Sequence, residues 1–91
     1  MDIRVLRYYL AICREGSMSR AAQVLHVTQP TLSRQIADLE RELGCELLIR
    51  GSRTVTPTEK GLYLRRRAEE IVSLADQTAS ELAHSNETIE G

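Results

Sequence analysis

The sequence predicts a mainly α-helical fold, in which three helices and a two-stranded β-hairpin are followed by a long C-terminal helix. Apolar residues recur at helical spacing through most of the 91 residues, and residues that commonly begin or end helices flank these stretches. Between Gly44 and Pro57 the period changes to one that is typical of short strands. Phe and Trp are absent, so we expect an aliphatic core in one small domain with a helical appendage.

The first two helices follow from capping residues and from the spacing of apolar side chains. We expect the first helix over residues 3–15, with Asp2 as its N-cap and Gly16 as the left-handed residue after its end. Ser17 caps the second helix. The inward residues are Ile3, Leu6, Tyr9, Leu10 and Cys13 on the first helix and Ala21, Ala22 and Leu25 on the second.

A tight turn at His26-Val27 leads into a third helix, which we expect over residues 29–43 with Thr28 as its N-cap and a proline in its first turn. Its apolar residues fall on one stripe, as expected for a helix that packs on a core. Two amphipathic helices joined by so short a turn are typical of a helix-turn-helix, here residues 17–43, whose second helix can lie in the major groove of DNA. The stripe consists of Leu32, Ile36, Leu39 and Leu43.

The hairpin follows directly after this motif. We expect its strands within residues 47–50 and 53–56, with a glycine-containing turn between them and Pro57 at the end. A hairpin in this place is a wing. Residues 1–57 are therefore predicted to form a winged helix-turn-helix domain.

The last helix begins after a capping Thr58 and is expected to reach about residue 85, before a frayed tail. Such a helix is roughly 40 Å long, more than a head of this size can cover. Its apolar residues form a heptad-like seam that needs a partner, and the simplest partner is a second copy. Residues 58–91 are thus predicted to be a linker helix for homodimerisation with a frayed tail. The seam consists of Leu64, Ala68, Ile71, Ala75, Thr78 and Leu82.

The formal net charge of −1 conceals a strong asymmetry along the chain. Residues 1–67 contain all 12 basic residues and 7 of the 13 acidic ones, whereas residues 68–91 contain 6 acidic residues and no Lys or Arg. Eleven of the 12 basic residues are Arg, which suits bidentate contacts with phosphate and guanine, although a GC-rich genome would also enrich Arg. A basic head with an acidic tail is compatible with a nucleic-acid partner.

The start of the third helix carries side chains that can contact bases and phosphates. Gln29 can bond adenine bidentately, and Arg34 can do the same with guanine. Capping alone explains any single Ser, Thr or Pro here, and a surface Arg is ordinarily solvated, but their joint placement favours contact with DNA. The other candidates are Pro30 and Thr31 for a thymine methyl group, and Thr28 and Ser33 for phosphates.

Arg50 and Arg53 bracket the turn of the predicted wing, where packing does not explain them. A guanidinium in this position can enter a narrow minor groove, where negative potential is concentrated. The alternative is that they pair with Glu42 or Glu46. The three arginines at residues 65–67 can either touch phosphates or solubilise the helix, and we favour the second role.

Other functional classes find little support. Cys13 and Cys45 are expected to be buried thiols, and His26 and His84 have no partners at metal-ligand spacing, so we expect no metal site. No pattern for a cofactor or a catalytic group is present, so we do not expect an enzyme. The chain has neither an apolar run long enough to span a membrane nor a signal-peptide pattern, and we expect a cytoplasmic protein.

The order of these elements, together with the stretch A-A-Q-V-L-H-V-T-Q-P-T-L-S-R-Q-I-A-D-L-E-R-E-L-G, resembles the N-terminal domain of LysR-type transcriptional regulators. The resemblance runs from the first residue to about residue 75. It includes the pair Ala21-Ala22, the L-E-x-x-L-G ending at Gly44, and R-x-V-x-P-T-E-x-G from Arg53 to Gly61.

The resemblance implies a bacterial, nucleoid-associated regulator that binds double-stranded DNA as a homodimer at an interrupted inverted repeat. Residues 29–43 would lie in the major groove and the wing, residues 47–56, at the minor groove. Family members also carry a C-terminal domain that binds a small-molecule inducer, and full-length members can form tetramers. We therefore expect this chain to be a DNA-binding fragment without the effector-binding domain. The competing hypothesis is a helical dimerisation module whose head contacts protein.

Overall fold

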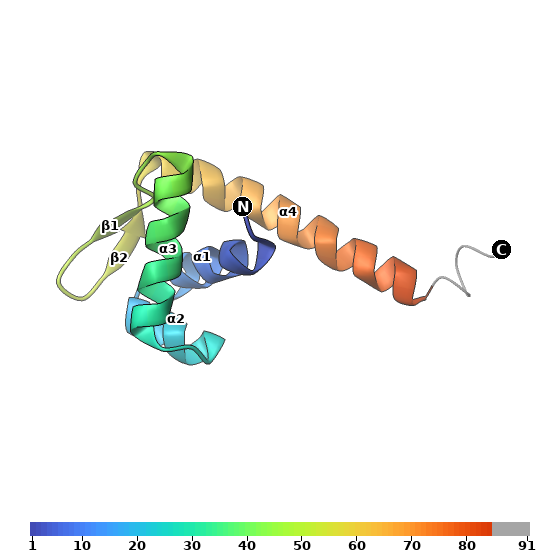
Figure 1. Cartoon of the computed structure of the whole chain (residues 1–91), viewed down its shortest axis with the longest axis horizontal. Coiled ribbons are helices and arrows are strands. Elements are labelled where there is room, and N and C mark those ends of the chain that lie inside the picture. Colours follow the sequence, from blue (N-terminus) through green and yellow to red (C-terminus); the bar gives the residue numbers. More distant parts are fainter. Residues whose placement is uncertain (85–91) are drawn as a thin grey trace.

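The computed structural model describes residues 1–84 and consists of a helical head from which one long helix extends (Figure 1). Its principal extents are 55 × 26 × 19 Å, because the last helix continues well past the head. The two strands form an antiparallel hairpin on the side of the head away from that helix (Figure 1). The elements are α1 (Ile3–Glu15), α2 (Met18–Leu25), α3 (Gln29–Leu43), β1 (Leu48–Arg50), β2 (Val55–Pro57) and α4 (Glu59–Ala83).

All four predicted N-caps are confirmed. The side chains of Asp2, Ser17, Thr28 and Thr58 each accept a hydrogen bond from a backbone N–H in the first turn of the helix that follows. Such a bond satisfies one of the N–H groups that a helix start leaves without a partner, which is why short polar residues precede each helix. The helices consequently begin where the sequence predicts them.

The helix ends also follow the prediction. Gly16 and Gly44 adopt left-handed conformations with φ of 68° and 71°, and their N–H groups return to the preceding helix. His26 ends α2 in the same conformation, with φ of 59°, although it is not a glycine. The predicted end of the last helix near residue 85 and the frayed tail lie outside the described residues, and α4 ends at Ala83.

The core is centred on α1, which contacts α2, α3, β2 and α4. The core is aliphatic, as predicted, except at Tyr9. This residue was predicted on the inward face of the first helix; it is fully buried and donates a hydrogen bond of 2.9 Å to the Leu47 carbonyl oxygen. A phenol can occupy this position because its hydroxyl has a partner. Burial raises the pKa of this phenol, so it stays neutral. The core residues are Val5, Leu6, Tyr9, Ala11, Ile12, Met18, Ala21, Ala22, Leu32, Ile36, Leu39, Leu47, Leu48, Val55, Leu64 and Ala68.

The predicted inward face of α1 is wrong in part. Ile3 is exposed, whereas Val5 and Ile12 are buried. Leu10 and Cys13 are only partly buried. Because α1 has neighbours on several sides, its buried surface is wider than a single stripe and is rotated from the one that we expected. Leu43, predicted to belong to the core stripe of α3, is 40% exposed because it lies in the last turn, at the edge of the head.

The hairpin is shorter than predicted. β1 pairs with β2 in the register Leu48↔Pro57, so Pro57 is the last residue of the ladder, and Arg53 and Thr54 belong to the turn. A proline is tolerated there because the position is at the end of a two-stranded sheet. The Val55 N–H donates to the Gly16 carbonyl oxygen at 3.0 Å, which attaches the hairpin to the end of α1.

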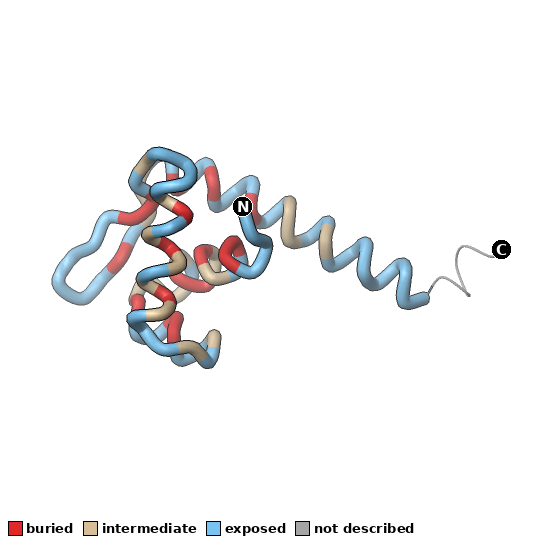
Figure 2. The backbone as a smooth tube through the Cα atoms, viewed as in Figure 1, coloured by how far each residue is buried: buried red, intermediate tan, exposed pale blue. Residues whose placement is uncertain are grey.

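Helix α4 has a buried beginning and an exposed end (Figure 2). Leu64 and Ala68 are buried in the core, and Ile71 and Val72 pack partly against it. All residues from 76 to 83 are exposed. The predicted seam therefore divides into two parts, because the same helical stripe first packs on the head and then leaves it.

Candidate nucleic-acid interface

The two helices of the helix-turn-helix are held together by a turn of minimal length. The left-handed His26 lets its N–H reach the carbonyl oxygens of Ala22 and Gln23, and the Val27 N–H donates to the Ala22 oxygen at 3.0 Å. The chain can then begin α3 at once, after the cap at Thr28. The turn is what fixes the start of α3 relative to the head.

The first turns of α3 present most of the predicted contact residues to solvent. Gln29, Pro30 and Arg34 are exposed, whereas Thr31 and Ser33 are half-buried. Gln29 and Arg34 do not share one side of α3, because five residues at 3.6 per turn place them roughly 140° apart. Their joint placement is thus at one end of the helix and not on a single face.

Thr28 is occupied within the chain. Its Oγ1 accepts from the Thr31 N–H at 3.3 Å and donates to the Thr31 Oγ1 at 2.7 Å. A hydroxyl that donates in this way has no proton left for a phosphate, whereas the proton of the Thr31 hydroxyl remains available. The structure therefore favours the capping role for Thr28 and makes Thr31 the better donor.

A groove lies between the wing and the helix-turn-helix, and Gln29 lines it together with the wing arginines, Arg50 and Arg53. Sequence reasoning did not select Ser17, Met18 and Ser19, which form another wall of the groove. The serine-rich start of α2 was a signal for them, but only the fold shows that it faces the wing. The groove is lined by Ser17, Met18, Ser19, Gln29, Arg50, Gly51, Ser52, Arg53 and Val55.

Arg50 and Arg53 have no ion-pair or hydrogen-bond partner for their guanidinium groups in the described part of the chain, and the same holds for Arg34. The alternative pairing with Glu42 does not form, because this carboxylate binds the amino terminus at 2.9 Å. Six other arginines do pair with carboxylates. They are Arg4, Arg7, Arg14, Arg41, Arg65 and Arg67.

We use the name reading face for the exposed candidate residues at the start of α3, Gln29, Pro30 and Arg34, together with Arg50 and Arg53 of the wing, although Gln29 and Arg34 lie on different sides of α3. Its cations have no ion-pair partner within residues 1–84. Unpaired guanidinium groups are bidentate donors that match phosphate oxygens and the acceptor edge of guanine. The reading face is thus suited to a polyanion with exposed hydrogen-bond acceptors.

The arginines at residues 65–67 behave differently. Arg65 pairs with Glu69 and Arg67 with Glu70 along α4. The guanidinium groups of Arg66 and Arg67 each lie 5.5 Å from the centre of the Tyr63 ring. These contacts are local to α4, as expected for a solubilising role.

Chemistry of other kinds has little support in residues 1–84. No group of three or more His, Cys, Asp or Glu residues is arranged there to hold a metal ion. Burial raises the pKa of the Cys13 thiol, which keeps it protonated and weakly reactive. Within the same residues, no helix combines the length and apolar character needed to cross a membrane.

Comparison with protein families gives a match over residues 3–62, from the start of α1 into α4, to the family described as bacterial regulatory helix-turn-helix protein, lysR family. This chain belongs to the LysR family. The match includes the helix-turn-helix and the wing, and it confirms the family that the sequence resembles.

Relatives with known names agree with this assignment. The LysR-family chain is 42% identical over all of its 91 residues to the nitrogen assimilation regulatory protein nac of Klebsiella aerogenes, of which it covers 30%. It is 46% identical over 80 residues to the HTH-type transcriptional regulator BenM of Acinetobacter baylyi, which is 88% of this chain and 26% of that protein. The chain therefore spans less than a third of the length of these relatives.

Solved structures confirm the winged helix-turn-helix fold of the LysR-family chain. A crystal structure of a BenM_DBD/catB site 1 DNA complex has a TM-score of 0.91 at 42% identity, over 96% of this chain and 97% of that chain. A CbnR_DBD–DNA complex has a TM-score of 0.89 at 35% identity, over 94% and 99% of the two chains. Both neighbours contain DNA.

Proposed function

We propose that this chain is the DNA-binding part of a LysR-type transcriptional regulator and that it binds double-stranded DNA sequence-specifically. The observation that carries the proposal is the groove that Gln29 lines together with two wing arginines, which have no partner within the described chain. In this arrangement α3 enters the major groove while the wing reaches the flanking minor groove. Crystal structures of similar chains in complex with DNA support DNA as the partner of this fold.

The contacts divide into base readout and positioning. Gln29 and Arg34 are placed to bond adenine and guanine, and Pro30 offers an apolar contact to a thymine methyl group. Thr31 and Ser33 are half-buried, so they suit short contacts with phosphates near the helix start. Arg50 and Arg53 supply charge at the wing. Thr28 contributes by capping α3 and not by contacting DNA.

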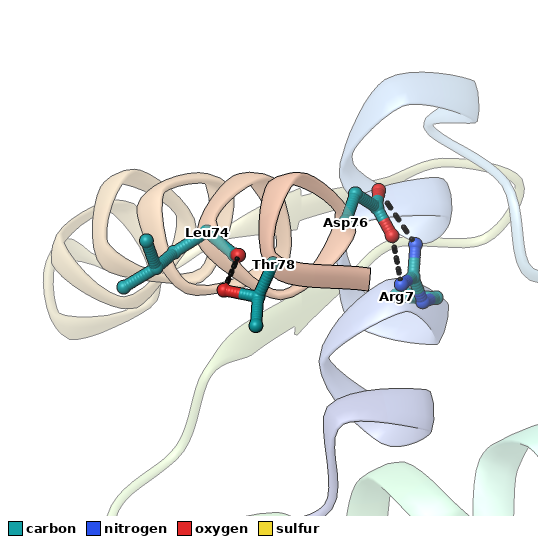
Figure 3. A network of polar contacts seen from close by, with 4 residues as sticks. All are labelled: Arg7, Leu74, Asp76 and Thr78. Atoms are coloured by element: carbon teal, nitrogen blue, oxygen red, sulfur yellow. Dashed lines mark hydrogen bonds and ion pairs between the residues drawn. The ribbon is translucent and has the colours of Figure 1, made fainter. Parts of the chain in front are cut away.

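We further propose that α4 mediates homodimerisation, so that two reading faces bind an interrupted inverted repeat. Leu74 and Leu82 are each 63% exposed, although apolar residues of this size are seldom left uncovered in a row. Thr78 contributes apolar surface to the same stripe because its hydroxyl donates to the Leu74 carbonyl oxygen at 2.7 Å (Figure 3). The face consists of Ile3, Ile71, Leu74, Ala75, Thr78, Ala79 and Leu82.

This face differs from the predicted seam at its beginning. Leu64 and Ala68 are already buried within the head. Among the predicted residues, we therefore assign the contact between copies to the remaining four, which are Ile71, Ala75, Thr78 and Leu82. Leu74, which sequence reasoning did not select, becomes a central member. Leu74 does not occupy one of the heptad positions of the predicted seam, counted from Leu64.

For the whole regulator we propose three further properties that go beyond this chain. A small-molecule inducer would bind to a C-terminal domain, full-length copies could assemble into tetramers, and the protein would act on the nucleoid in the cytoplasm. Their support is the family of regulators to which the chain belongs and the small share of its relatives that the chain covers. None of these roles requires catalysis by the described residues.

Selection of bound sequences from a random duplex library tests the proposed function. We expect an inverted repeat of two short half-sites separated by a spacer. The binding constant for the selected site should fall steeply with salt, because each neutralised phosphate contributes a slope of about −0.9 in the double-logarithmic plot. No enrichment of any sequence, together with a flat salt response, would favour the competing hypothesis of a head that contacts protein.

A further inference from the structure

One ion pair links the head to the long helix. The Arg7 guanidinium on α1 donates to both oxygens of the Asp76 carboxylate on α4, at 2.6 Å from Nη2 and 3.3 Å from Nη1 (Figure 3). The two residues are 69 positions apart in the sequence. Among the ion pairs between side chains in residues 1–84, it alone joins two different helices.

The pair is the outermost polar contact between α4 and the head. Before it, α4 is held by the buried Leu64 and Ala68 and by the partly buried Ile71 and Val72. After it, residues 77–83 are all exposed. A bidentate contact at this point opposes sideways rotation of α4, whereas the apolar contacts near Leu64 are close to the pivot and oppose it less.

The direction of α4 has a large geometric effect on a dimer. From Leu64 to Ala83 the helix extends roughly 28 Å, at 1.5 Å per residue. A rotation of about 10° about the Leu64 end would move the far end by roughly 5 Å, which exceeds the rise of about 3.4 Å per base pair. In a dimer held at the far end of α4, a change in this angle turns each head about the Leu64 end and so changes where its reading face lies relative to that of the partner.

We propose that Arg7 and Asp76 form a positioning pair that sets the angle between the head and α4, and thereby the spacer length that the dimer accepts between its half-sites. This inference rests on the proposed dimerisation through α4. It concerns neither residue's contact with DNA, because Arg7 lies on α1 and Asp76 on α4, and neither belongs to the reading face.

The electrostatics of the pair agree with this role. The Arg7 guanidinium lowers the pKa of the Asp76 carboxyl, so the carboxylate is charged throughout the neutral range. Both side chains are exposed, with 44% and 61% of their surface accessible, so the pair contributes little to the stability of the fold. Such a weak pair can favour one angle between the head and α4 without determining whether the head folds.

Three variants of the 91-residue chain test the proposal. Asp76→Asn keeps the shape of the side chain and removes its charge. The double exchange Arg7→Asp with Asp76→Arg restores a pair of opposite polarity. Glu70→Gln is the matched control, because it removes the same charge from α4 but breaks only the local pair with Arg67.

Each variant is measured in two binding assays and by sedimentation. The first assay uses duplexes that carry the selected half-sites with spacers of different lengths, and spacer preference is the affinity ratio between the best spacer and those one base pair shorter or longer. The second uses a single half-site. We expect Asp76→Asn to lower the spacer preference by about threefold, the size of effect typical of an exposed pair, without changing half-site affinity or dimerisation. The exchange should recover the preference, and Glu70→Gln should match the wild type.

Two results would overturn the inference while leaving dimerisation intact. The first is an Asp76→Asn dimer with the spacer preference of the wild type. The second is a loss of half-site affinity equal to the loss on the full site, which would assign the pair to the stability of the head. A wild-type chain that stays monomeric on a full site would instead refute the proposed dimer, and this inference would fall with it.

Discussion

Within residues 1–84, the reading face and the far half of α4 leave different groups without partners. On the reading face, Arg34, Arg50 and Arg53 carry unpaired guanidinium groups. On α4, Arg65 and Arg67 are paired with glutamates, while Leu74 and Leu82 are uncovered. Unpaired cations at one end and uncovered leucines at the other indicate two partners of opposite character, a polyanion and an apolar surface.

The largest expected effect comes from placing charge on the uncovered part of α4. The double change Leu74→Asp with Leu82→Asp should weaken dimerisation by at least about 4 kcal/mol, because each copy would lose two buried leucines and gain two buried charges. Sedimentation at several protein concentrations measures this. Gln77→Asp, a change at an exposed position outside the apolar face, is the control.

In the variant with both leucines replaced, the affinity for a single half-site should stay near the wild-type value, since the reading face is unchanged. A dimer that persists at micromolar concentration would show that the leucines face solvent in the assembled protein. An apolar partner would then no longer be inferred for α4, whereas the polyanionic partner of the reading face would still be.

The next largest effect concerns the contact between the start of α4 and the head, which connects the reading face to the far half of α4. A Cβ at Gly61 would collide with the Leu47 carbonyl oxygen and the Tyr9 hydroxyl, so Gly61→Ala should lower the free energy of unfolding by about 3 kcal/mol. Chemical denaturation measures the loss. Gly51→Ala in the wing is the matched control, because its added Cβ would meet Thr54 atoms at 3.3 Å, in an exposed turn that can adjust. Equal losses for the two variants would argue against a tightly packed junction.

A smaller effect is expected at one residue of α3. Arg34→Ala should weaken binding to the selected site by about 2 kcal/mol and relax the preference at one base position. Thermal stability should stay the same, since the guanidinium has no partner to lose. Binding measured on the selected site and on single-base variants separates the two roles. A uniform loss on every sequence would reassign Arg34 to a phosphate.

The smallest effect sharpens the contrast between unpaired and paired arginines. The double change Arg50→Gln with Arg53→Gln should weaken the free energy of DNA binding by about 1 kcal/mol. It should also reduce the slope of the logarithm of the binding constant against the logarithm of salt concentration by about 2, because two phosphate contacts are removed. Arg41→Gln is the control, since Arg41 pairs with Asp38 at 2.8 Å near the far end of α3. Titration at several salt concentrations measures both quantities. If Arg41→Gln changes this slope as much as the wing variant does, then the absence of an ion-pair partner does not identify the arginines that contact DNA.

Local patterns in the sequence were sufficient for the helix starts and for the glycine-capped helix ends, but not for the strand boundaries of the hairpin. Asp2, Ser17, Thr28 and Thr58 were predicted as caps because an N-cap acts within its own first turn, so its effect depends on neighbours that the sequence displays. The same is true of Gly16 and Gly44, whose left-handed conformations end α1 and α3. The family was also recognisable, since its motif is a continuous stretch of the chain.

Burial was harder to predict because it depends on how many neighbours an element has. The periodicity of α1 favoured Ile3, yet Val5 and Ile12 occupy the core, because helices pack on α1 from several sides. Leu64 and Ala68 look like any other seam positions in the sequence. Only the docking of α4 on α1 converts them to core residues and leaves Leu74 uncovered.

The candidate site combines both kinds of information. Gln29, Arg34, Arg50 and Arg53 could be selected from residue type and position alone, because guanidinium and amide groups near a helix start or a hairpin turn have few structural uses. The sequence by itself therefore determined the elements, their ends and the chemistry available at each. The tertiary structure decided that Gln29 meets the wing across a groove, that Ser17 and Ser19 join it, and that Arg7 reaches Asp76 across 69 positions. The physical reason is that caps and turns act over one helical turn, whereas the groove and the ion pair between Arg7 and Asp76 depend on how whole elements dock.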